Sequence, residues 1–356
     1  MPYNVRLAIR LLLERLFSFV LKLMVILNFI PWIWMVVKTY TYRFGKWLLR
    51  HLTHLCQLQR IIYGELPGSK RIRLVEASLR SSRSDVVAQA LKNLALKVDI
   101  GYFDTRNLRR VEVSAAAHAI ANAKGINIKC HTGFVPKLAD CLEMMYSYED
   151  LRMKLENTRA IRYAIENNSH ETKLLEIWKN FMYPEELSGR KSRQWQYLGF
   201  QGNDPSTDFR ASGELGLNFI LYFSRTYQER AKQVLGVSNH PMYSFPLAIL
   251  MIQIGETGFQ LFRRGQAKTH FYNRHSTILS LDEGAKAVDF ITRAQGLVGI
   301  FYDFCCVLLI EFTRFWLSKK PKNIMAFPPI YEEFVNMINE RLKDDESMLL
   351  MDIQTI

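Results

Sequence analysis

The residues best suited to chemistry lie in one block, residues 195–213, which reads WQYLGFQGNDPSTDFRASG. Its glycine, asparagine, aspartate, proline and serine content is typical of an ordered loop, and loops held by rigid helices often carry functional residues. Within the block, Asp208 is close enough to Arg210 to orient that guanidinium or to neutralise it. From the residues alone, Arg210 is either a functional cation or one half of an ion pair that fastens the loop.

Three shorter patterns point toward enzymes, but each lacks a required residue. Residues 170–174 (HETKL) begin like a zinc-protease helix and end in leucine where the second histidine is needed. The glycines at 213 and 216 are not followed by the Gly-Lys-Ser/Thr of a phosphate-binding loop. Residues 188–191 (SGRK) match Ser-x-x-Lys, a pattern short enough to arise by chance. We therefore expect no resident metal, no cofactor and no self-contained active site.

The elements that position these residues are predicted to be helices, so the fold class is all-α. Hydrophobic residues make up 49% of the 356 residues, and only 18 glycines and 11 prolines interrupt them, which favours long helices over short strands. The apolar stretches 215–235, 245–262 and 285–316 each contain charged residues. We expect core helices there instead of additional membrane spans.

Three serines are predicted to begin helices. Ser147 precedes an apolar-periodic stretch, and Ser280 with Glu283 matches a capping box, in which each side chain satisfies a free backbone N–H group. Ser169 is expected to cap a further helix that ends before Pro184.

Positive charge is concentrated near the N-terminus. Residues 1–60 carry nine lysines and arginines against Glu14 alone, which accounts for +8 of the formal net charge of +13. These basic residues flank an apolar segment instead of lining a polar surface, a pattern that favours anionic lipid headgroups over nucleic acid. We therefore expect membrane lipids, and no nucleic acid, among the partners.

An apolar segment between Arg15 and Lys38, interrupted by Lys22, is predicted to anchor the chain in a membrane. At ~1.5 Å rise per helical residue its length reaches about the ~30 Å of a bilayer core. Asn28 and Pro31 also permit a hairpin within one leaflet, so both forms stay open. A buried core helix is a further alternative, although such a helix normally has a polar face.

The main domain is predicted to face the cytosol, on the endoplasmic reticulum or another endomembrane. More positive charge follows the apolar segment than precedes it, which favours a cytosolic location for the residues that follow. The five cysteines are an odd number without a Cys-x-x-Cys pair, which fits a reducing compartment.

Composition divides the chain into four parts. Residues 1–63 are the anchor and a basic amphipathic segment, and 64–85, rich in serine, arginine and glycine, are a predicted hinge. Residues 86–340 are the helical domain, and 341–356 are a C-terminal tail. Within the first part, residues 44–62 either lie on the membrane surface or pack on the domain.

The block at 195–213 closely resembles the signature of the ELMO domain, roughly W-x-x-x-G-F-Q-G-x-D-P-x-T-D-F-R-G-x-G. The preceding NSHE at 168–171 and RKSRQW at 190–195 are also similar to the family. The resemblance covers about residues 44–335, and its signature region is 168–223.

The chain is similar to the short ELMOD branch, whose members are GTPase-activating proteins for Arf and Arf-like small GTPases. This resemblance implies an enzyme regulator, in which Arg210 is the catalytic residue and is inserted into the partner's nucleotide site, while GTP and magnesium belong to the partner. The resemblance implies supporting roles for Trp195, Gly199, Phe200, Gln201, Asp208 and Gly213. Ala211 departs from the usual glycine, and a positive φ there would cost on the order of 1 kcal/mol and displace the arginine.

Two other functions remain as alternatives. The first is a membrane-tethered scaffold that binds a GTPase without accelerating it. The second is a long ELMO scaffold that assists exchange factors for Rac-type GTPases, but those proteins carry additional repeat, lipid-binding and proline-rich segments. The length of this chain disfavours the second alternative.

Overall fold

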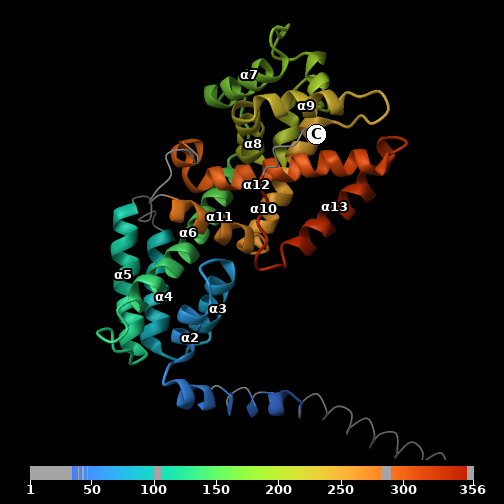
Figure 1. Cartoon of the computed structure of the whole chain (residues 1–356). Coiled ribbons are helices and arrows are strands. Elements are labelled where there is room, and N and C mark those ends of the chain that lie inside the picture. Colours follow the sequence, from blue (N-terminus) through green and yellow to red (C-terminus); the bar gives the residue numbers. More distant parts are fainter. Residues whose placement is uncertain are drawn as a thin grey trace, which may run out of the picture. The chain divides into compact units, whose positions relative to one another are not determined.

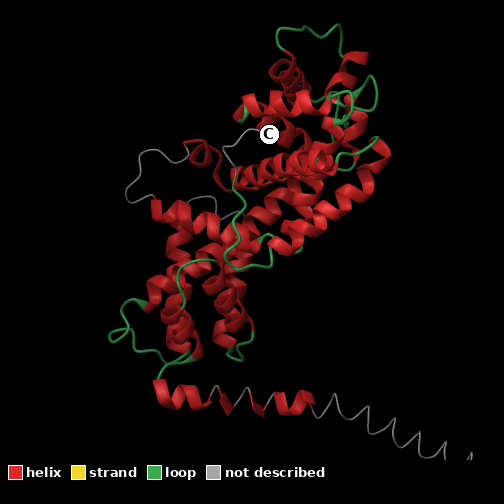
Figure 2. Cartoon of the chain, turned by 45° about the vertical axis from the view of Figure 1, so that its right-hand side comes forward, coloured by secondary structure: helices red, strands yellow, loops and turns green. Residues whose placement is uncertain are grey.

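The computed structural model describes residues 34–38, 40–41, 44–45, 47–99, 106–281 and 290–350. Within these residues every regular element is a helix and none is a strand (Figure 2), which confirms the predicted all-α class. Contacts divide the chain into two compact units, Met1–Arg60 and Ile61–Ile356.

The described residues of the first unit include helical residues 34–38 and 47–53. Across the described residues, no helix combines the length and the apolar composition needed to cross a bilayer. The predicted anchor between Arg15 and Lys38 lies outside the described residues except at 34–38, so it stays a prediction.

The second unit is a bundle of α-helices with short 3₁₀ helices in its connections (Figure 1). Helix α2 (Gln57–Gly64) begins before the boundary between the units and ends after it. The following α-helices are α3 (Ser69–Arg80), α4 (Asp85–Asp99), α5 (Arg106–Ala123), α6 (Phe134–Ala160), α7 (Asn168–Met182), α8 (Gly213–Thr226), α9 (Gln228–Ser238), α10 (Leu247–Arg263), α11 (Lys268–Leu281), α12 (Phe290–Lys319) and α13 (Phe327–Arg341). The 3₁₀ helices are η2 (Arg193–Leu198), η3 (Pro205–Arg210) and η4 (Ile324–Ala326).

Helix α6 connects the two halves of this bundle. It packs against α3, α4 and α5 and also against α8, α11 and α12, and Figure 1 shows it running from one group to the other. Residues 141–148 are all buried, so the middle of this helix has no exposed face. The Tyr148 hydroxyl donates a hydrogen bond to the carbonyl of Phe262 at 2.6 Å, and its ring stacks on that phenylalanine.

The apolar stretches predicted as core helices have that role. The first is divided between α8 and α9 at Tyr227, and the others correspond to α10 and α12. Helix α10 packs on both α8 and α12. Helices α10 and α12 approach each other closely at Gly258, where a Cβ atom would lie 2.7 Å from the Sγ atom of Cys305. Cys305 and Cys306 are fully buried, so this strongly apolar part of α12 lies inside the domain.

The predicted hinge at 64–85 is wrong over most of its length. Residues 69–80 form α3, whose Ile72, Val75 and Leu79 are buried. This helix packs against α6 and α11. The apolar residues, three or four positions apart, form one buried stripe, while most of the arginines that suggested a hinge lie on the exposed face.

The predicted serine caps are also corrected. Ser147 is buried in the middle of α6, and Ser280 lies within α11, while its predicted partner Glu283 is outside the described residues. Helix α7 is capped by Asn167, whose side chain accepts a hydrogen bond from the Ser169 backbone N–H at 3.0 Å. Neighbouring polar residues compete for such a role, so sequence locates a cap only to within a few positions.

The predicted C-terminal tail packs against the domain as far as it is described. Leu349 is buried, and its backbone N–H donates to the Nδ1 atom of His270 at 3.1 Å. The side-chain amide of Asn273 donates to the carbonyls of Asp345 and Ser347 at 3.0 and 3.1 Å. Helix α11 therefore holds the chain that follows α13.

We expect acid to weaken this attachment. Burial, reinforced by the charge of Arg274, lowers the pKa of His270 from 6.5 to about 3. Because the folded pKa is the lower one, the stability from this histidine is complete above about pH 6.5 and is lost as the pH falls toward 3. Between these values the unfolding free energy should decrease by up to ~1.4 kcal/mol per pH unit from this group. Urea unfolding of His270→Gln should show a shallower pH slope, and equal slopes would contradict the assignment.

Candidate functional site

The predicted functional block forms an ordered connection between α7 and α8 that contains two 3₁₀ helices. The first, η2, follows Ser192, whose hydroxyl accepts the backbone N–H of Gln194 at 3.2 Å. The second, η3, follows Asp204, whose carboxylate accepts the backbone N–H of Ser206 at 3.1 Å. Pro205 suits the first position of η3 because a proline has no N–H group to leave unpaired. Local capping therefore gives the loop a regular backbone.

An aromatic cluster supports this loop from the protein interior. Trp195 is fully buried, and its ring lies edge-on to Trp178 of α7 and to Phe200, with centroids 5.3 and 5.7 Å away. Phe200 in turn contacts Phe209, which stacks on Tyr163 at 5.4 Å. Trp195 and Phe200 therefore hold the loop in place and do not reach its outer surface.

Two glycines in the block occupy positions that a side chain would not fit. Gly199 has a φ of +82°, and a Cβ atom there would lie 2.2 Å from a backbone nitrogen of α10. Gly213 has a φ of +54°, and a Cβ atom would lie 2.3 Å from the carbonyl oxygen of Arg159 and 2.5 Å from that of Ile161. The backbone conformation and the space both require glycine at these positions.

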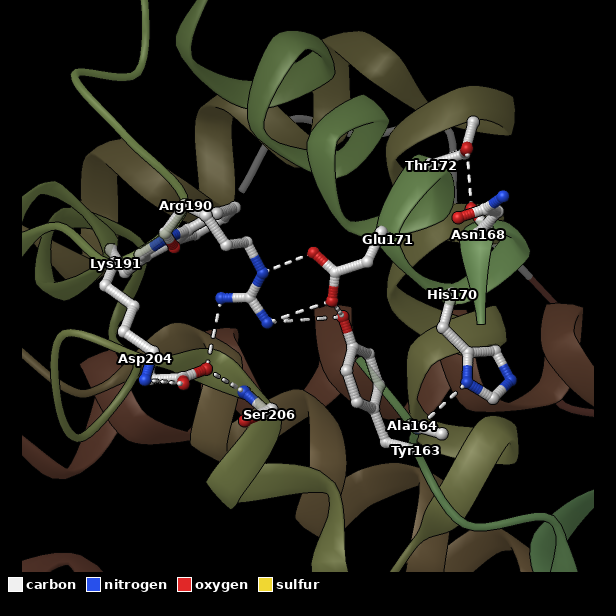
Figure 3. Close-up of polar contacts among 11 residues, drawn as sticks. Tyr163, Ala164, Asn168, His170, Glu171, Thr172, Arg190, Lys191, Asp204 and Ser206 are labelled. Atoms are coloured by element: carbon white, nitrogen blue, oxygen red, sulfur yellow. Dashed lines mark hydrogen bonds and ion pairs between the residues drawn. The ribbon is translucent and has the colours of Figure 1, made fainter. Parts of the chain in front are cut away.

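A half-buried arginine, Arg190, fastens the loop at the centre of Figure 3. Its Nε atom and one terminal nitrogen bind the carboxylate of Glu171 on α7, and its other terminal nitrogen binds Asp204 at 3.1 Å. The hydroxyl of Tyr163 donates to the same Glu171 carboxylate at 2.6 Å. The backbone carbonyl of Arg190 accepts the indole N–H of Trp195 at 3.0 Å. One residue thus joins α7, the aromatic cluster and the cap of η3.

The ionisation of this cluster favours these bonds. Burial alone would raise the pKa of Asp204, but hydrogen bonds from Ser206 and the charge of Arg190 outweigh it and hold that pKa below its usual range. Burial alone would lower the pKa of Arg190, but its contacts with Glu171, Tyr163 and Asp204 raise it overall. Burial and the hydrogen bond to Glu171 raise the pKa of Tyr163. The ion pairs and the neutral phenol are therefore present together near neutral pH.

Arg210 has the opposite surroundings, because its side chain is exposed. Its Nε atom donates to the carbonyl of Thr207 at 2.6 Å. Within the described part of the chain, its two terminal nitrogens have no hydrogen-bond or ion-pair partner. The interpretation of Arg210 as the ion pair that fastens the loop is therefore wrong, since Arg190 has that role. Arg210 presents the outer edge of its guanidinium to solvent.

Asp208 stabilises the turn through the backbone and does not bind the guanidinium of Arg210. Its carboxylate accepts the backbone N–H of Gln201 at 3.0 Å, which connects the segment between η2 and η3 to η3 itself. Burial raises the pKa of Asp208, although the Gln201 N–H and the charge of Arg210 act in the opposite direction. The side chain of Gln201 is exposed.

Ala211, which departs from the family signature, causes no strain. Its φ and ψ are −87° and −34°, in the right-handed helical region that any L-residue adopts. The positive φ that would have displaced Arg210 therefore does not occur at this position.

The sequence patterns did not reveal how the residues that fasten the loop pair with one another, although Glu171 and Arg190 lie in the segments 168–171 and 190–195 that resemble the family. Arg190 falls in a Ser-x-x-Lys pattern, and Glu171 falls in a zinc-protease-like pattern whose histidine, His170, instead accepts the Ala164 backbone N–H at 3.1 Å. The two carboxylates bound by Arg190 lie 19 and 14 residues away along the chain. No local spacing indicates such a pairing.

The fold and the site together define an all-helical module that presents an arginine on a braced surface loop. The model of the ELMO/CED-12 family matches residues 153–331. The chain therefore belongs to the ELMO/CED-12 family, and its relatives place it in the short ELMO domain-containing branch.

These relatives match over most of their length. ELMO domain-containing protein 2 of Mus musculus is 33% identical over 325 residues, which cover 90% of this chain and 98% of that protein. ELMO domain-containing protein 1 of Mus musculus is 30% identical over 327 residues, which cover 87% of this chain and 90% of that protein. ELMO domain-containing protein B of Dictyostelium discoideum is 29% identical over 305 residues, which cover 85% of this chain and 95% of that protein. No solved structure matches the chain.

We expect Gly213→Ala and Ala211→Gly, two positions apart, to differ strongly in their effect on stability. Gly213→Ala should destabilise the domain by more than ~2 kcal/mol, because a left-handed backbone costs an alanine about 1 to 2 kcal/mol and its Cβ would also collide with two carbonyls. Ala211→Gly should change stability by less than ~1 kcal/mol, since only backbone entropy is altered. Urea unfolding measures both, and similar losses in the two variants would refute the assigned conformations.

Removal of the Arg190 side chain should loosen the loop. Arg190→Ala leaves Glu171 and Asp204 without their cation, and we expect a loss of roughly 2 to 3 kcal/mol. The expected loss of stability is smaller than for a fully buried ion pair, because the Arg190 side chain is 24% exposed. Arg225→Ala is the matched control, since Arg225 pairs with Glu176 while 55% exposed and should cost below ~1 kcal/mol. An Arg190 variant as stable as this control would show that the cluster does not fasten the loop.

Proposed function

We propose that this protein engages a small GTPase of the Arf family and accelerates GTP hydrolysis by inserting Arg210 into the partner's nucleotide site. The observation that carries the proposal is the exposed guanidinium of Arg210, whose terminal nitrogens are unpaired within the described residues. The similarity to the short ELMOD branch supports the choice of partner, because that branch is associated with activation of Arf and Arf-like GTPases.

The chemistry of hydrolysis explains why an arginine suits this role. Negative charge is spread over the phosphate oxygens in the transition state, and a planar guanidinium can neutralise it through two parallel N–H donors. Such an inserted arginine contributes ~10³ to 10⁵ in rate in GTPases that use one. A lysine keeps the charge but lacks the paired donors.

The loop supports this chemistry by limiting the motion of the arginine before the partner arrives. The bond from Nε to Thr207 leaves both terminal nitrogens available for a phosphate. Below the turn, the Arg190 cluster and the buried Trp195 hold the backbone. A catalytic group that is ordered in advance loses less entropy when it enters the transition state.

In this proposal the chain is a regulator of another enzyme. The partner supplies GTP, magnesium and the attacking water, and this chain supplies the cation that completes the partner's site. We further propose that the basic and apolar N-terminal residues hold the domain on the cytosolic face of the endoplasmic reticulum or another endomembrane, where a lipid-associated GTPase is within reach.

We expect Arg210→Ala and Arg210→Lys to abolish stimulated hydrolysis without unfolding the domain. The readout is phosphate release in single-turnover reactions with GTP-loaded Arf and Arf-like proteins. Arg193→Ala is the matched control, since Arg193 is an exposed cation of the same loop and its removal changes the net charge equally. We expect the control to retain most of the stimulation, because it loses only long-range attraction.

Two results would count against the proposal. Unchanged stimulation by Arg210→Ala would exclude the insertion of this arginine. Tight binding of a GTP-loaded partner by the unaltered chain, with no increase in phosphate release, would favour the membrane-tethered scaffold instead. Thermal unfolding of each variant shows whether a loss of rate reflects the site or the fold.

A further inference from the structure

Helices α12 and α13 are joined by an exposed turn, residues 319–326, which we call the hairpin tip (Figure 1). Lys320, directly after the last residue of α12, has a φ of +47°, and Pro321 is buried. Asn323 then caps η4, because its side chain accepts the backbone N–H of Met325 at 3.0 Å. Backbone capping and the buried Pro321 therefore give the turn a defined shape.

Two consecutive apolar residues project from the hairpin tip. Ile324 is 45% exposed and Met325 is 80% exposed. Single exposed apolar residues are common on protein surfaces, but here they stand together on a turn, and the adjacent Pro328 and Pro329 are exposed as well. Within the described part of the chain, nothing covers them.

Three lysines precede these apolar residues in the turn. Lys319 is paired with Glu333 at 2.5 Å. Lys320 and Lys322 are exposed and have no ion-pair partner among the described residues. The other nearby carboxylate in sequence is Glu332 of α13, which is also exposed. Unpaired positive charge next to exposed apolar side chains is the composition of surfaces that enter the headgroup region of anionic bilayers.

The loop between α9 and α10 lies beside this turn and enlarges the surface. Trp316, near the end of α12, donates its indole N–H to the carbonyl of Tyr243 in that loop at 2.8 Å. Figures 1 and 2 both show the two segments side by side. Met242 in the same loop is 63% exposed. Asn239, at the start of the loop, donates to the carbonyl of Tyr197 on η2 at 3.2 Å, which links this surface to the segment that precedes Arg210.

We propose that the hairpin tip is a membrane-contact site, in which Ile324 and Met325 enter the surface of an anionic bilayer while Lys320 and Lys322 bind its headgroups. Amphipathic helices that combine lysines with apolar residues bury the apolar residues about 5 to 10 Å into that layer, and this turn presents the same two kinds of side chain. An acidic protein surface would satisfy the lysines but would give no reason for the exposed apolar pair that follows them. This site is separate from the N-terminal segment and does not depend on the proposed activity toward a GTPase.

An environment-sensitive dye placed at the hairpin tip of the full chain tests this proposal. Cys56 and Cys130, the cysteines whose residues are not buried, are replaced by serine, and a nitrobenzoxadiazole dye is attached to Met325→Cys. Phosphatidylcholine vesicles with and without phosphatidylserine are added, and flotation measures how much protein they carry. The same dye on Val111→Cys of α5, a position that is 66% exposed, is the positional control.

We expect the dye at the hairpin tip to brighten and shift to shorter wavelength on phosphatidylserine vesicles, much less on pure phosphatidylcholine, and not at the control position. Lys320→Glu with Lys322→Glu should lose most of this response. Lys92→Glu with Lys129→Glu, an equal charge change on exposed residues elsewhere, should retain it. Added salt should weaken the response because the headgroup attraction is screened.

The design distinguishes this site from membrane binding by other parts of the chain. Protein that floats with phosphatidylserine vesicles while the dye at position 325 stays as it is in buffer would overturn the proposal. An equal response on uncharged vesicles that survives reversal of both tip lysines would overturn the headgroup role. Failure of the chain to float on any vesicle would overturn it as well.

Discussion

The guanidinium of Arg190, bonded to Glu171 on one side and to Asp204 on the other, is the contact on which the candidate site depends. Partial burial of a cation is unfavourable, and two carboxylates in paired geometry offset that cost here. Because Asp204 also caps η3, the ion pair sets where the turn that ends at Arg210 begins. The two arginines therefore have different roles. Arg190 is half-buried and shapes the loop, whereas Arg210 is exposed.

Most of the helical architecture could be predicted from the sequence, because long apolar stretches with few glycines and prolines have few alternatives. The errors arose where local composition and tertiary burial disagree. Residues 69–80 are rich in serine and arginine, yet they form α3. The three apolar residues on one face of this helix are covered by α6 and α11. Ser147 resembles a cap in sequence but is buried in the middle of α6, where packing overrides its local preference.

The position of the candidate loop could be predicted from the sequence, but the side-chain contacts that hold it could not. The composition of residues 195–213 predicts an ordered loop, which the structure confirms, and Gly199 and Gly213 have a positive φ there. The roles of Arg190, Glu171 and Asp204 depend on how α7 meets the loop, a relation that exists only after folding. Spacing along the chain also suggested that Asp208 acts on Arg210, whereas its carboxylate binds the Gln201 backbone instead.

The end of α6 and the beginning of α8 meet head to tail beside the candidate site, since the carbonyl of Ile161 accepts the N–H of Glu214 at 2.8 Å. A helix carries partial negative charge at its C-terminus and partial positive charge at its N-terminus, so these two ends attract and partly cancel. The backbone N–H of Glu214 is therefore already bonded, and the dipole of α8 attracts an approaching anion less strongly. The electrostatic attraction of this surface therefore resides in the guanidinium of Arg210, which its Nε bond to Thr207 positions, and not in the backbone amides at the start of α8.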